Sequence, residues 1–405
     1  MKPAVAHLLP DYNPFPPTYA AGTELRVEQA SMRQTRYRPV VVCGWFEGQA
    51  QTEQRGPMRI RRIRLGRLYR RLFRKVTRLD PLPYTARMWR ILMEEQAAIV
   101  HIHNEPKLLG GLLSRLEHSP LPVVVHVANE KPLPAAALHR VTRWVACSRY
   151  IAQWLVRDNG IAAERVEVIY TGVDAGSRRP LWEIPAPERA ALRQRLGIAD
   201  PRTTVLLFAG RLVKEKGVDE LLDAYERLRR SHPGKLELVI AGNVRESGDP
   251  RNEKAVYGKA VTARIAAMQG VRWIGSLNPE AMHEFLLAGD VFVLPSLWSD
   301  PFPTVMLEAA AAGLPIVAAA RGGITEFLEG CPAFSFVENP SDPDSLAAAI
   351  ARYIDAPGER GEAGRWLRAR IEREYDWGRV ARDFEDLYDR LLAGAPVGAK
   401  ADQHR

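Results

Sequence analysis

The sequence has few cysteines and no long apolar run. Its 405 residues include three cysteines, Cys43, Cys147 and Cys331, which are odd in number and far apart in the chain. They do not form a disulfide framework or a metal-binding cluster, so we expect a reduced, cytoplasmic compartment. No stretch reaches the ~18 consecutive apolar residues of a membrane span, and the apolar run before Pro10 is too short for a signal peptide. These absences predict a protein that is soluble or peripheral to a membrane.

Acidic residues are absent from one stretch, residues 59–78, which reads RIRRIRLGRLYRRLFRKVTR. Ten of its residues are Arg or Lys, whereas the whole chain has a net charge of +9. Apolar residues recur within it at helical spacing, and basic residues fill the other face of the predicted helix. This pattern is typical of a basic amphipathic helix that lies on an anionic membrane surface. The predicted docking residues are Arg67, Arg70, Arg71, Arg74 and Lys75.

Two other interpretations of residues 59–78 stay open. The apolar stripe of the helix can pack on its own domain and leave the basic face in solvent. A run of cations also binds phosphate backbones, so nucleic-acid binding is a rival function. The chain has no DNA-binding or RNA-binding motif, and we therefore expect no nucleic-acid partner.

Length and pattern predict two α/β domains. A chain of 405 residues exceeds what one core usually supports, and its 46% apolar and 26% charged residues are ordinary for a globular protein. Short β-branched runs alternate with longer helical patterns, which indicates doubly wound parallel sheets. The first set of predicted strands covers residues 4–9, 39–44, 98–103, 122–127, 143–148 and 166–170. The second set covers residues 204–210, 236–243, 271–275, 290–296 and 315–320.

Changes in pattern place the domain boundaries. Gly, Pro and charged residues replace the periodic pattern in residues 171–187, so we assign 1–177 to an N-terminal domain and 178–375 to a C-terminal domain. Residues 376–393 form a predicted amphipathic helix that packs back toward the N-terminal domain, and 394–405 form a predicted disordered tail. Ligands of open parallel sheets bind at the carboxyl ends of the strands, which directs attention to the loops that follow them.

Two segments in the second half carry candidate anion-binding residues. GRLVKEKG, residues 210–217, follows a predicted strand, and its Arg211 and Lys216 flank a helix start, where anions bind well. SDPFPTVMLE places Asp300 and Glu308 on either side of a helix entry. Each pattern also fits a purely structural role: a strand-helix turn with solvated charges in the first segment and a helix N-cap in the second.

The order of the segments resembles a known family. GRLVKEKG, LVIAGN, VRWIGSL and VFVLPSLWSDPFPTVMLEAAAAGLPIVAAARGGITEF follow one another as in the C-terminal domain of retaining GT-B glycosyltransferases of family 4, the glycosyl transferases group 1. AGTELRVEQAS looks like the glycine loop of that family, and VACSRYIAQWLVRDNGIAAERVEVIYTGVD looks like its domain-closing segment. HIHNEP and HVANE look most like the bacterial spore-coat and lipopolysaccharide-core transferases. The resemblance implies a GT-B fold of two Rossmann-like domains that face each other across a cleft.

The resemblance also implies roles for residues at matching positions. Those implied in donor binding are Gly22, Gly210, Arg211, Lys216, Thr304, Val305 and Glu308. Those implied in catalysis are Arg211, Lys216, Asp300 and His126. Arg211 and Lys216 would hold the donor diphosphate, while Glu308 would hold the nucleotide ribose. Asp300 would contact hydroxyls of the transferred sugar, and most relatives have Glu at its position.

Histidines end two predicted strands in the first half. A histidine in an apolar strand is more often a core residue than a catalyst, but relatives carry one at the position of His126, near the donor sugar and the acceptor hydroxyl. His103 and Asn104, within HIHNEP, are candidates for acceptor contacts.

No metal or other cofactor is expected. The D-x-D segment from Asp342 to Asp344 opens a predicted helix and is interpreted as a capping turn. Arg211 and Lys216 would supply the positive charge that a metal supplies in other transferases.

Taken together, these patterns and the resemblance imply a retaining, metal-independent hexosyltransferase. It would move a hexose or N-acetylhexosamine from a nucleoside-diphosphate sugar, expected to be a UDP-sugar, to a cell-envelope glycan, lipopolysaccharide or lipid-linked acceptor. We expect it at the cytoplasmic face of the plasma membrane, as a peripheral protein. The alternatives are a GDP-mannose-dependent mannosyltransferase of the same fold and a non-catalytic nucleotide-sugar-binding protein.

Overall fold

The protein divides into two compact α/β units. The structure is a computed structural model that describes residues 2–17, 22–66, 69, 80–234, 236–244, 252–332 and 336–394. Unit 1 comprises the chain up to Thr171 and from Trp377 onward, and unit 2 comprises Gly172–Asp376. The first unit ends at Thr171 rather than at residue 177 because the segment after it bonds within unit 2, where Val173 N–H donates to Tyr375 O at 2.8 Å.

Unit 1 is built on an eight-stranded sheet of order β3-β4-β2-β1-β5-β6-β7-β8. Its strands are β1 Ala4–Leu8, β2 Arg38–Gly44, β3 Thr52–Arg55, β4 Met58–Ile63, β5 Ala97–His103, β6 Val123–Val127, β7 Arg143–Ala146 and β8 Val166–Val168. All neighbours are parallel except β3 and β4, which form an antiparallel pair. The predicted parallel sheet is therefore confirmed, with a hairpin added at one edge.

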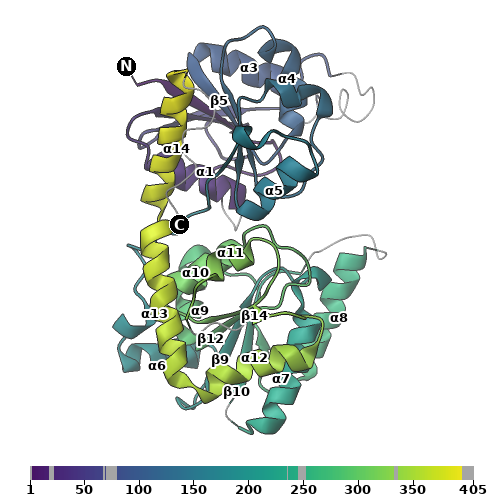
Figure 1. The fold of residues 1–405 in the computed structure, drawn as a ribbon, viewed down its shortest axis with the longest axis vertical. Helices are drawn as coiled ribbons and strands as arrows, with labels where there is room; N and C mark the ends of the chain where they lie inside the picture. Colours follow the sequence, from purple (N-terminus) through teal and green to yellow (C-terminus); the bar gives the residue numbers. More distant parts are fainter. Residues whose placement is uncertain are drawn as a thin grey trace. The chain divides into compact units, whose positions relative to one another are not determined.

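The helices of unit 1 cover the central strands. They are α1 Gly22–Met32, α3 Tyr84–Glu94, α4 Lys107–Leu116, α5 Arg149–Arg157 and α14 Trp377–Leu392, with short 3-10 turns at Ala135–Arg140 and Ala163–Arg165. Helices α1 and α14 share a core with Val5 of β1, Ile99 of β5 and Val124 of β6. Figure 1 shows α3 and α4 beside each other, away from α14. The last helix thus belongs to the first unit although unit 2 separates them in sequence.

The basic stretch does not begin as a helix. Residues 58–63 form β4, where Met58 and Ile60 alternate with basic residues and enter a core with β2. This period of two overrides the helical spacing because every second residue is buried against the sheet. Arg59 and Arg61 point to the other face, where both form ion pairs with Glu95. The rest of the predicted helix, with all five docking residues, lies outside the described residues except for residues 64–66 and Tyr69.

Unit 2 is built on a six-stranded parallel sheet of order β11-β10-β9-β12-β13-β14. Its strands are β9 Thr204–Ala209, β10 Leu236–Ala241, β11 Val271–Trp273, β12 Val291–Leu294, β13 Ile316–Ala319 and β14 Phe336–Val337. Its helices are α6 Ala186–Arg195, α7 Val218–Ser231, α8 Glu253–Ala267, α9 Pro279–Ala288, α10 Thr304–Ala311, α11 Ile324–Leu328, α12 Pro343–Asp355 and α13 Pro357–Glu374, with 3-10 turns at Leu181–Glu183 and Lys214–Lys216.

Helices cover both faces of this second sheet. Leu206 and Phe208 of β9 share a core with α7, α8 and α12. Helix α10 contacts α9 and α13 instead, and Figure 1 shows α10 and α13 away from α7. The doubly wound arrangement follows from strands whose alternate residues are all buried, which need an apolar cover on each side.

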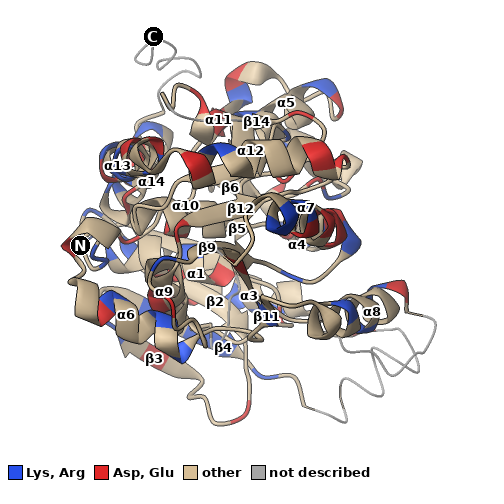
Figure 2. Cartoon of the chain, turned by 90° about the horizontal axis from the view of Figure 1, so that it is seen from below, with Lys and Arg blue, Asp and Glu red and all other residues tan. Residues whose placement is uncertain are grey.

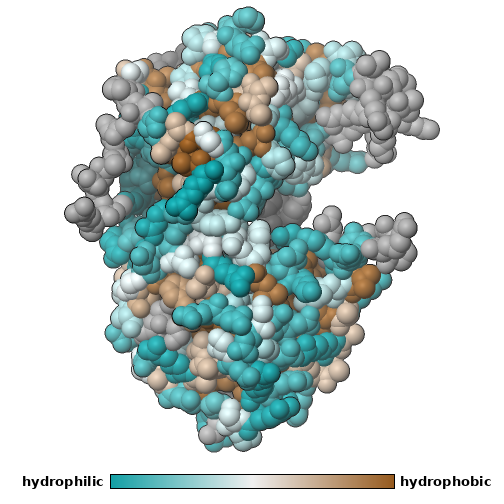
Figure 3. Space-filling view, turned by 45° about the vertical axis from the view of Figure 1, so that its right-hand side comes forward, coloured by the Kyte–Doolittle hydropathy of each residue, from teal (hydrophilic) through white to brown (hydrophobic). Residues whose placement is uncertain are grey.

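The surface is mostly polar. Figure 2 shows both signs of charge on α7 of unit 2, and the face in Figure 3 is largely hydrophilic with separate hydrophobic areas. Within the described residues, no helix is long and apolar enough to cross a membrane.

Candidate functional site

The carboxyl edge of the unit 2 sheet gathers the predicted donor-site residues. The loop after β9 holds Gly210, Arg211 and Lys216, and it ends at Gly217, where α7 begins. Gly217 has a φ of 70°, and a Cβ there would lie 2.0 Å from the carbonyl oxygen of Pro295. Only glycine fits both constraints. The tight turn therefore brings this loop against the loop that follows β12, the neighbouring strand.

Lys216 and Asp300 meet where these two loops touch. Their side chains form a short ion pair and are mostly buried, with 13% and 8% of their respective surfaces exposed. The Lys216 ammonium also lies 5.6 Å from the ring centroid of Trp298. Sequence reasoning paired neither Lys216 with Asp300 nor Lys216 with Trp298, although Trp298 stands only two positions before Asp300. The ion pair places one cation and one carboxylate together at the sheet edge.

A double glycine fixes the position of the loop that carries Asp300. Gly322 has a φ of 59°, and a Cβ on it would lie 2.3 Å from the Asp300 carbonyl oxygen. The Gly323 N–H donates to the same oxygen at 2.9 Å. The turn after β13 thus holds the backbone of Asp300 in place, and a side chain at either glycine would displace it.

Helix α10 presents its first turn at the same edge. It begins at Thr304 after Pro303, and no side chain caps its N-terminus. Both Thr304 and Val305 are partly exposed. The N–H groups of a first helical turn lack intrahelical acceptors and favour negative charge. The N–H groups at the start of α10 are therefore suited to donate hydrogen bonds to a phosphate group.

Glu308 lies one turn further along α10 and faces Arg178. The Arg178 Nη2 to Glu308 Oε1 distance is 3.7 Å, and the two side chains are 15% and 20% exposed. Burial raises the pKa of Glu308, and the positive charge of Arg178 opposes that rise. Sequence reasoning missed Arg178, which lies in the segment GSRRP interpreted as a linker. Glu308 thus combines a largely buried carboxyl group with one cationic neighbour.

The two predicted residues at the start of the loop differ in how they are held. The Arg211 side chain is exposed, whereas Gly210 is held by a backbone hydrogen bond. The Gly210 N–H donates to Ala241 O at 3.0 Å, which ties the loop to the end of β10. Within unit 2 the structure thus pairs Lys216 with Asp300, places Gly210 and the start of α10 at the same sheet edge, and leaves Arg211 facing solvent.

The predicted residues of unit 1 lie at the corresponding edge of the other sheet. Gly22 is the first residue of α1, and a Cβ there would meet no atom within 4 Å. His126 of β6 is fully buried, and its Nδ1 lies 3.1 Å from Arg26 Nη1. The Arg26 guanidinium also donates to the Thr171 hydroxyl at 3.0 Å. Sequence reasoning missed Arg26, whose place within an α1 helical pattern gave no sign of burial.

His103 ends β5 beside His126, and Asn104 follows it. Burial lowers the pKa of both histidines well below the ordinary value, and the charge of Arg26 adds to this effect. Asn104 has a φ of 49°, which is unusual for a residue other than glycine. Its backbone N–H donates to His126 O at 2.7 Å, and Lys131 Nζ donates to its carbonyl at 2.6 Å. Two hydrogen bonds thus hold Asn104 in its left-handed conformation. Residues in such uncommon backbone conformations cluster at functional sites.

The D-x-D segment has the predicted structural role. The Asp342 carboxylate accepts from the N–H groups of Asp344 and Ser345 and caps α12. Its oxygens are therefore already used by the backbone, and the capping interpretation is confirmed.

Two family profiles match the chain, and they divide it much as the two sheets do. The profile of Glycosyl transferases group 1 matches residues 188–368, and that of Glycosyltransferase Family 4 matches residues 29–176. The chain is 32% identical over 332 residues to the lipopolysaccharide 1,2-N-acetylglucosaminetransferase of Salmonella typhimurium, covering 80% of this chain and 82% of that protein. The chain belongs to this glycosyltransferase family. It is also 28% identical to spore coat protein SA of Bacillus subtilis, over 77% of this glycosyltransferase and 83% of that protein.

Solved structures share the fold of this glycosyltransferase. A sucrose-phosphate synthase from Thermosynechococcus elongatus has a TM-score of 0.75 at 17% identity and covers 97% of this chain and 100% of that one. The HepE protein of Anabaena, in complex with UDP and glucose, has a TM-score of 0.70 at 19% identity, with 95% and 99% covered. The two α/β units thus have the GT-B fold, as the sequence resemblance implied.

Proposed function

We propose that the protein is a retaining, metal-independent hexosyltransferase. It transfers a hexose or N-acetylhexosamine from a UDP-sugar to a lipopolysaccharide-type, cell-envelope or lipid-linked acceptor. Unit 2 binds the donor and unit 1 binds the acceptor. The single observation that carries the donor assignment is the Lys216–Asp300 ion pair, which lies at the same sheet edge as the first turn of α10.

The proposed reaction exchanges one bond at the anomeric carbon. The bond to the diphosphate oxygen breaks, and a bond to the acceptor hydroxyl oxygen forms on the same face of the sugar. The acceptor proton passes to the departing phosphate, so that charge and atoms balance. We assign no protein nucleophile to this step.

Donor binding would change the partner of Lys216. A diphosphate carries more negative charge than one carboxylate and competes with Asp300 for the ammonium group. Asp300 is then free to accept hydrogen bonds from sugar hydroxyls, while Lys216, Arg211 and the α10 N–H groups stabilise the departing phosphate. In other enzymes, one such preorganised hydrogen-bond donor stabilises the transition state by roughly 2.7 to 4 kcal/mol. Glu308 accepts from the ribose hydroxyls in this assignment.

The nature of the substrates is argued from the relatives. HepE was solved with UDP-glucose, and the Salmonella relative is named for N-acetylglucosamine transfer to lipopolysaccharide. Both facts favour a UDP-sugar donor and an envelope acceptor for the present chain.

A panel of donor sugars tests the proposal. Slow hydrolysis of UDP-glucose, UDP-N-acetylglucosamine, UDP-galactose and GDP-mannose is measured with and without a chelator. We expect a UDP-sugar to be hydrolysed fastest and the chelator to leave its rate unchanged. Fastest turnover of GDP-mannose would instead support the mannosyltransferase alternative. Hydrolysis of no donor, together with tight UDP binding, would support a non-catalytic binding protein.

Membrane docking is a separate part of the proposal. Replacing Arg70, Arg71, Arg74 and Lys75 by Gln removes charges worth about 1 kcal/mol each at an anionic surface. Binding to liposomes that contain anionic lipid should weaken at least tenfold, while hydrolysis of the donor stays unchanged. The Arg59→Gln variant is a control, because Arg59 belongs to β4 and pairs with Glu95. Salt-sensitive binding to oligonucleotides without liposome binding would contradict membrane docking.

A further inference from the structure

Unit 1 contains a buried cluster of histidines, and the proposed transfer reaction gives this cluster no role. His7 of β1 and His101 and His103 of β5 each offer one ring nitrogen, and these three nitrogens lie within 4.8 Å of one another. The exposed fractions of the three residues are 2%, 0% and 3%. We propose that His7, His101 and His103 form a binding site for a transition-metal ion of the zinc type.

The fold brings these side chains together. Strands β1 and β5 are parallel neighbours, and His7 is in register with His101. His103 follows His101 by two residues and therefore points to the same face of the sheet. This face is the one that α1 and α14 cover, and Figure 1 shows α14 alongside unit 1 near β5. The three rings thus come from rigid strands and not from loops.

The contacts of the rings leave nitrogens available as ligands. His7 Nδ1 and His103 Nε2 face each other at 2.9 Å and share one proton. Two nitrogens bound at about 2.0 to 2.1 Å to one tetrahedral zinc ion lie only slightly further apart, so the ion can take the place of that proton after a small opening. The remaining nitrogens of both rings, His7 Nε2 and His103 Nδ1, make no hydrogen bond of ordinary geometry within the described residues, and Gln34 is the polar side chain that lies near His7. Either ring is therefore free to shift its own proton to that nitrogen.

The third histidine is already oriented. His101 Nδ1 lies 2.7 Å from the Tyr388 hydroxyl of α14, and its Nε2 has no hydrogen-bond partner in the described part of the chain. If Nδ1 donates to the tyrosine oxygen, the Nε2 lone pair is left for an ion. A hydrogen bond from the second nitrogen is what commonly fixes the tautomer and the orientation of metal-bound histidines. Tyr388 is therefore a positioning residue for the site.

The donor set selects the kind of ion. No aspartate or glutamate of the described residues completes the group, so Mg²⁺ and Ca²⁺, which prefer oxygen ligands, do not fit. Imidazole nitrogens suit Zn²⁺, Co²⁺, Ni²⁺ and Cu²⁺. The charged Arg26 contacts His126 and Thr171 and none of the three rings. Its positive charge opposes any cation, so affinity must come from coordination by the imidazoles. The ion would join β1, β5 and α14, and it takes no part in donor chemistry.

The experiment uses the full chain without a histidine tag. Purified protein is treated with a chelator, dialysed and loaded with Zn²⁺ or Co²⁺, and metal content, Co²⁺ absorption and thermal unfolding are then measured. We expect one tightly held ion per chain, a tetrahedral Co²⁺ spectrum and a higher melting temperature with Zn²⁺. The His7→Gln variant should lose all three effects, and Tyr388→Phe should bind about tenfold more weakly.

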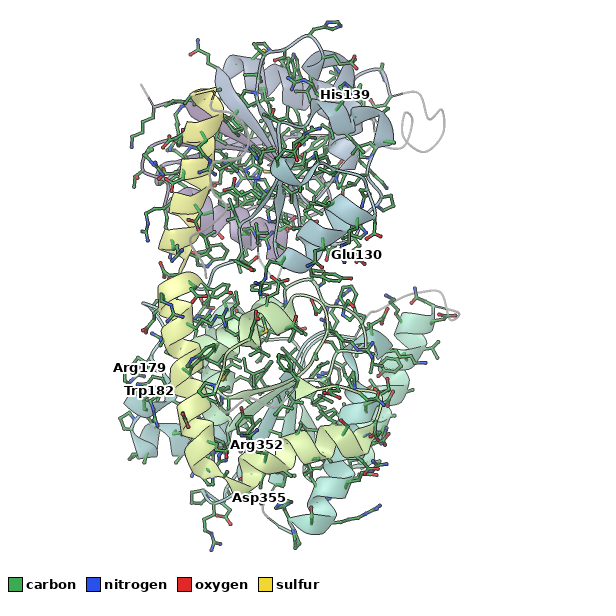
Figure 4. The ribbon with its side chains drawn as sticks, viewed as in Figure 1. Glu130, His139, Arg179, Trp182, Arg352 and Asp355 are labelled. Carbon is green, nitrogen blue, oxygen red and sulfur yellow. The ribbon has the colours of Figure 1, made fainter. Side chains whose placement is uncertain are left out.

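Control variants separate this site from surface binding. His139 is exposed on the outside of unit 1, as Figure 4 shows, so His139→Gln should keep full metal binding. If His7→Gln does not fold, His101→Gln replaces it. A chain that holds no ion and shows no melting shift would overturn the proposal. Unchanged metal binding by His7→Gln or His101→Gln would do so as well. Activity of the transferase does not enter this test.

Discussion

The two sheets of this glycosyltransferase carry opposite chemistry at the same edge. In unit 2 the carboxyl ends of the strands hold an ion pair, a carboxyl group beside an arginine and a helix N-terminus, all partly open to solvent. In unit 1 the same edge buries histidines, and burial lowers the pKa of His7 to about 3. One fold thus supports a charged sheet edge in one unit and a desolvated cluster in the other. Substitutions at the charged residues of unit 2 should therefore change activity, whereas substitutions in the apolar packing around the histidines of unit 1 should change stability.

The largest expected effect is on the stability of unit 1. Phe384 of α14 is 2% exposed, and its ring centroid lies 5.4 Å from that of His101. Phe384→Ala removes this packing, and we expect a loss of about 3 to 5 kcal/mol in the free energy of unfolding. Urea denaturation measures it. Leu392→Ala, on the same helix but 42% exposed, is the control and should cost far less. A loss below about 1 kcal/mol for Phe384→Ala would show that α14 is not part of the core.

The next effect is on catalysis in unit 2. Lys216→Ala and Glu308→Ala should each lower turnover at least a hundredfold, which is about 2.7 kcal/mol of transition-state stabilisation. Melting temperature and kcat/KM are measured together. Lys214→Ala is the matched control for Lys216, because Lys214 is exposed in the same loop. Near-normal activity in both variants, with the fold intact, would remove the site assignment.

The Asp300→Glu substitution tests whether residue 300 of unit 2 sets the preference for the donor sugar. The added methylene moves the carboxylate toward the sugar, and one methylene in a pocket is worth about 1 to 3 kcal/mol. We expect the ratio of kcat/KM between two donor sugars to change at least tenfold. Asp300→Asn keeps the length but removes the charge, and it should lower all rates without changing their ratio. An unchanged ratio in Asp300→Glu would place the sugar away from residue 300.

The smallest effect concerns His283 of unit 2, whose pKa is strongly lowered. Burial, with Arg178, Arg368 and Arg179 nearby, lowers the pKa of His283 to about 4 from 6.5. The folded state thus disfavours the protonated ring, and its contribution to stability is complete above pH 6.5 and is lost as the pH falls from 6.5 to 4.

His283→Gln should therefore flatten the pH dependence of the melting temperature in that window. The difference between pH 7 and pH 4 should shrink by an amount equivalent to about 1 to 2 kcal/mol, since the side chain is only partly buried. His118→Gln, at an exposed site, is the control. Identical pH profiles for His283→Gln and the parent protein would contradict the shift.

Sequence patterns were most reliable where burial is complete. Every predicted strand is present, with ends within about two residues, and the central strands are unbroken apolar runs because both of their faces are covered. The hairpin of β3 and β4 was missed, since Arg59 and Arg61 look like the face of a helix until Glu95 is known to lie beside them. The short strand β14 was also missed, and two residues carry too little pattern to be recognised.

The sequence by itself determined the two α/β units, the family and the segments that carry Lys216, Asp300 and Glu308, because spacing along the chain encodes strands, turns and motifs. Only the tertiary structure decided which side chains meet. It joined Lys216 to Asp300 and placed Arg178 beside Glu308. It also gathered His7 with His101, which is 94 positions away in the chain but adjacent in the sheet. Parallel pairing brings distant residues into register, and no local pattern records that partner.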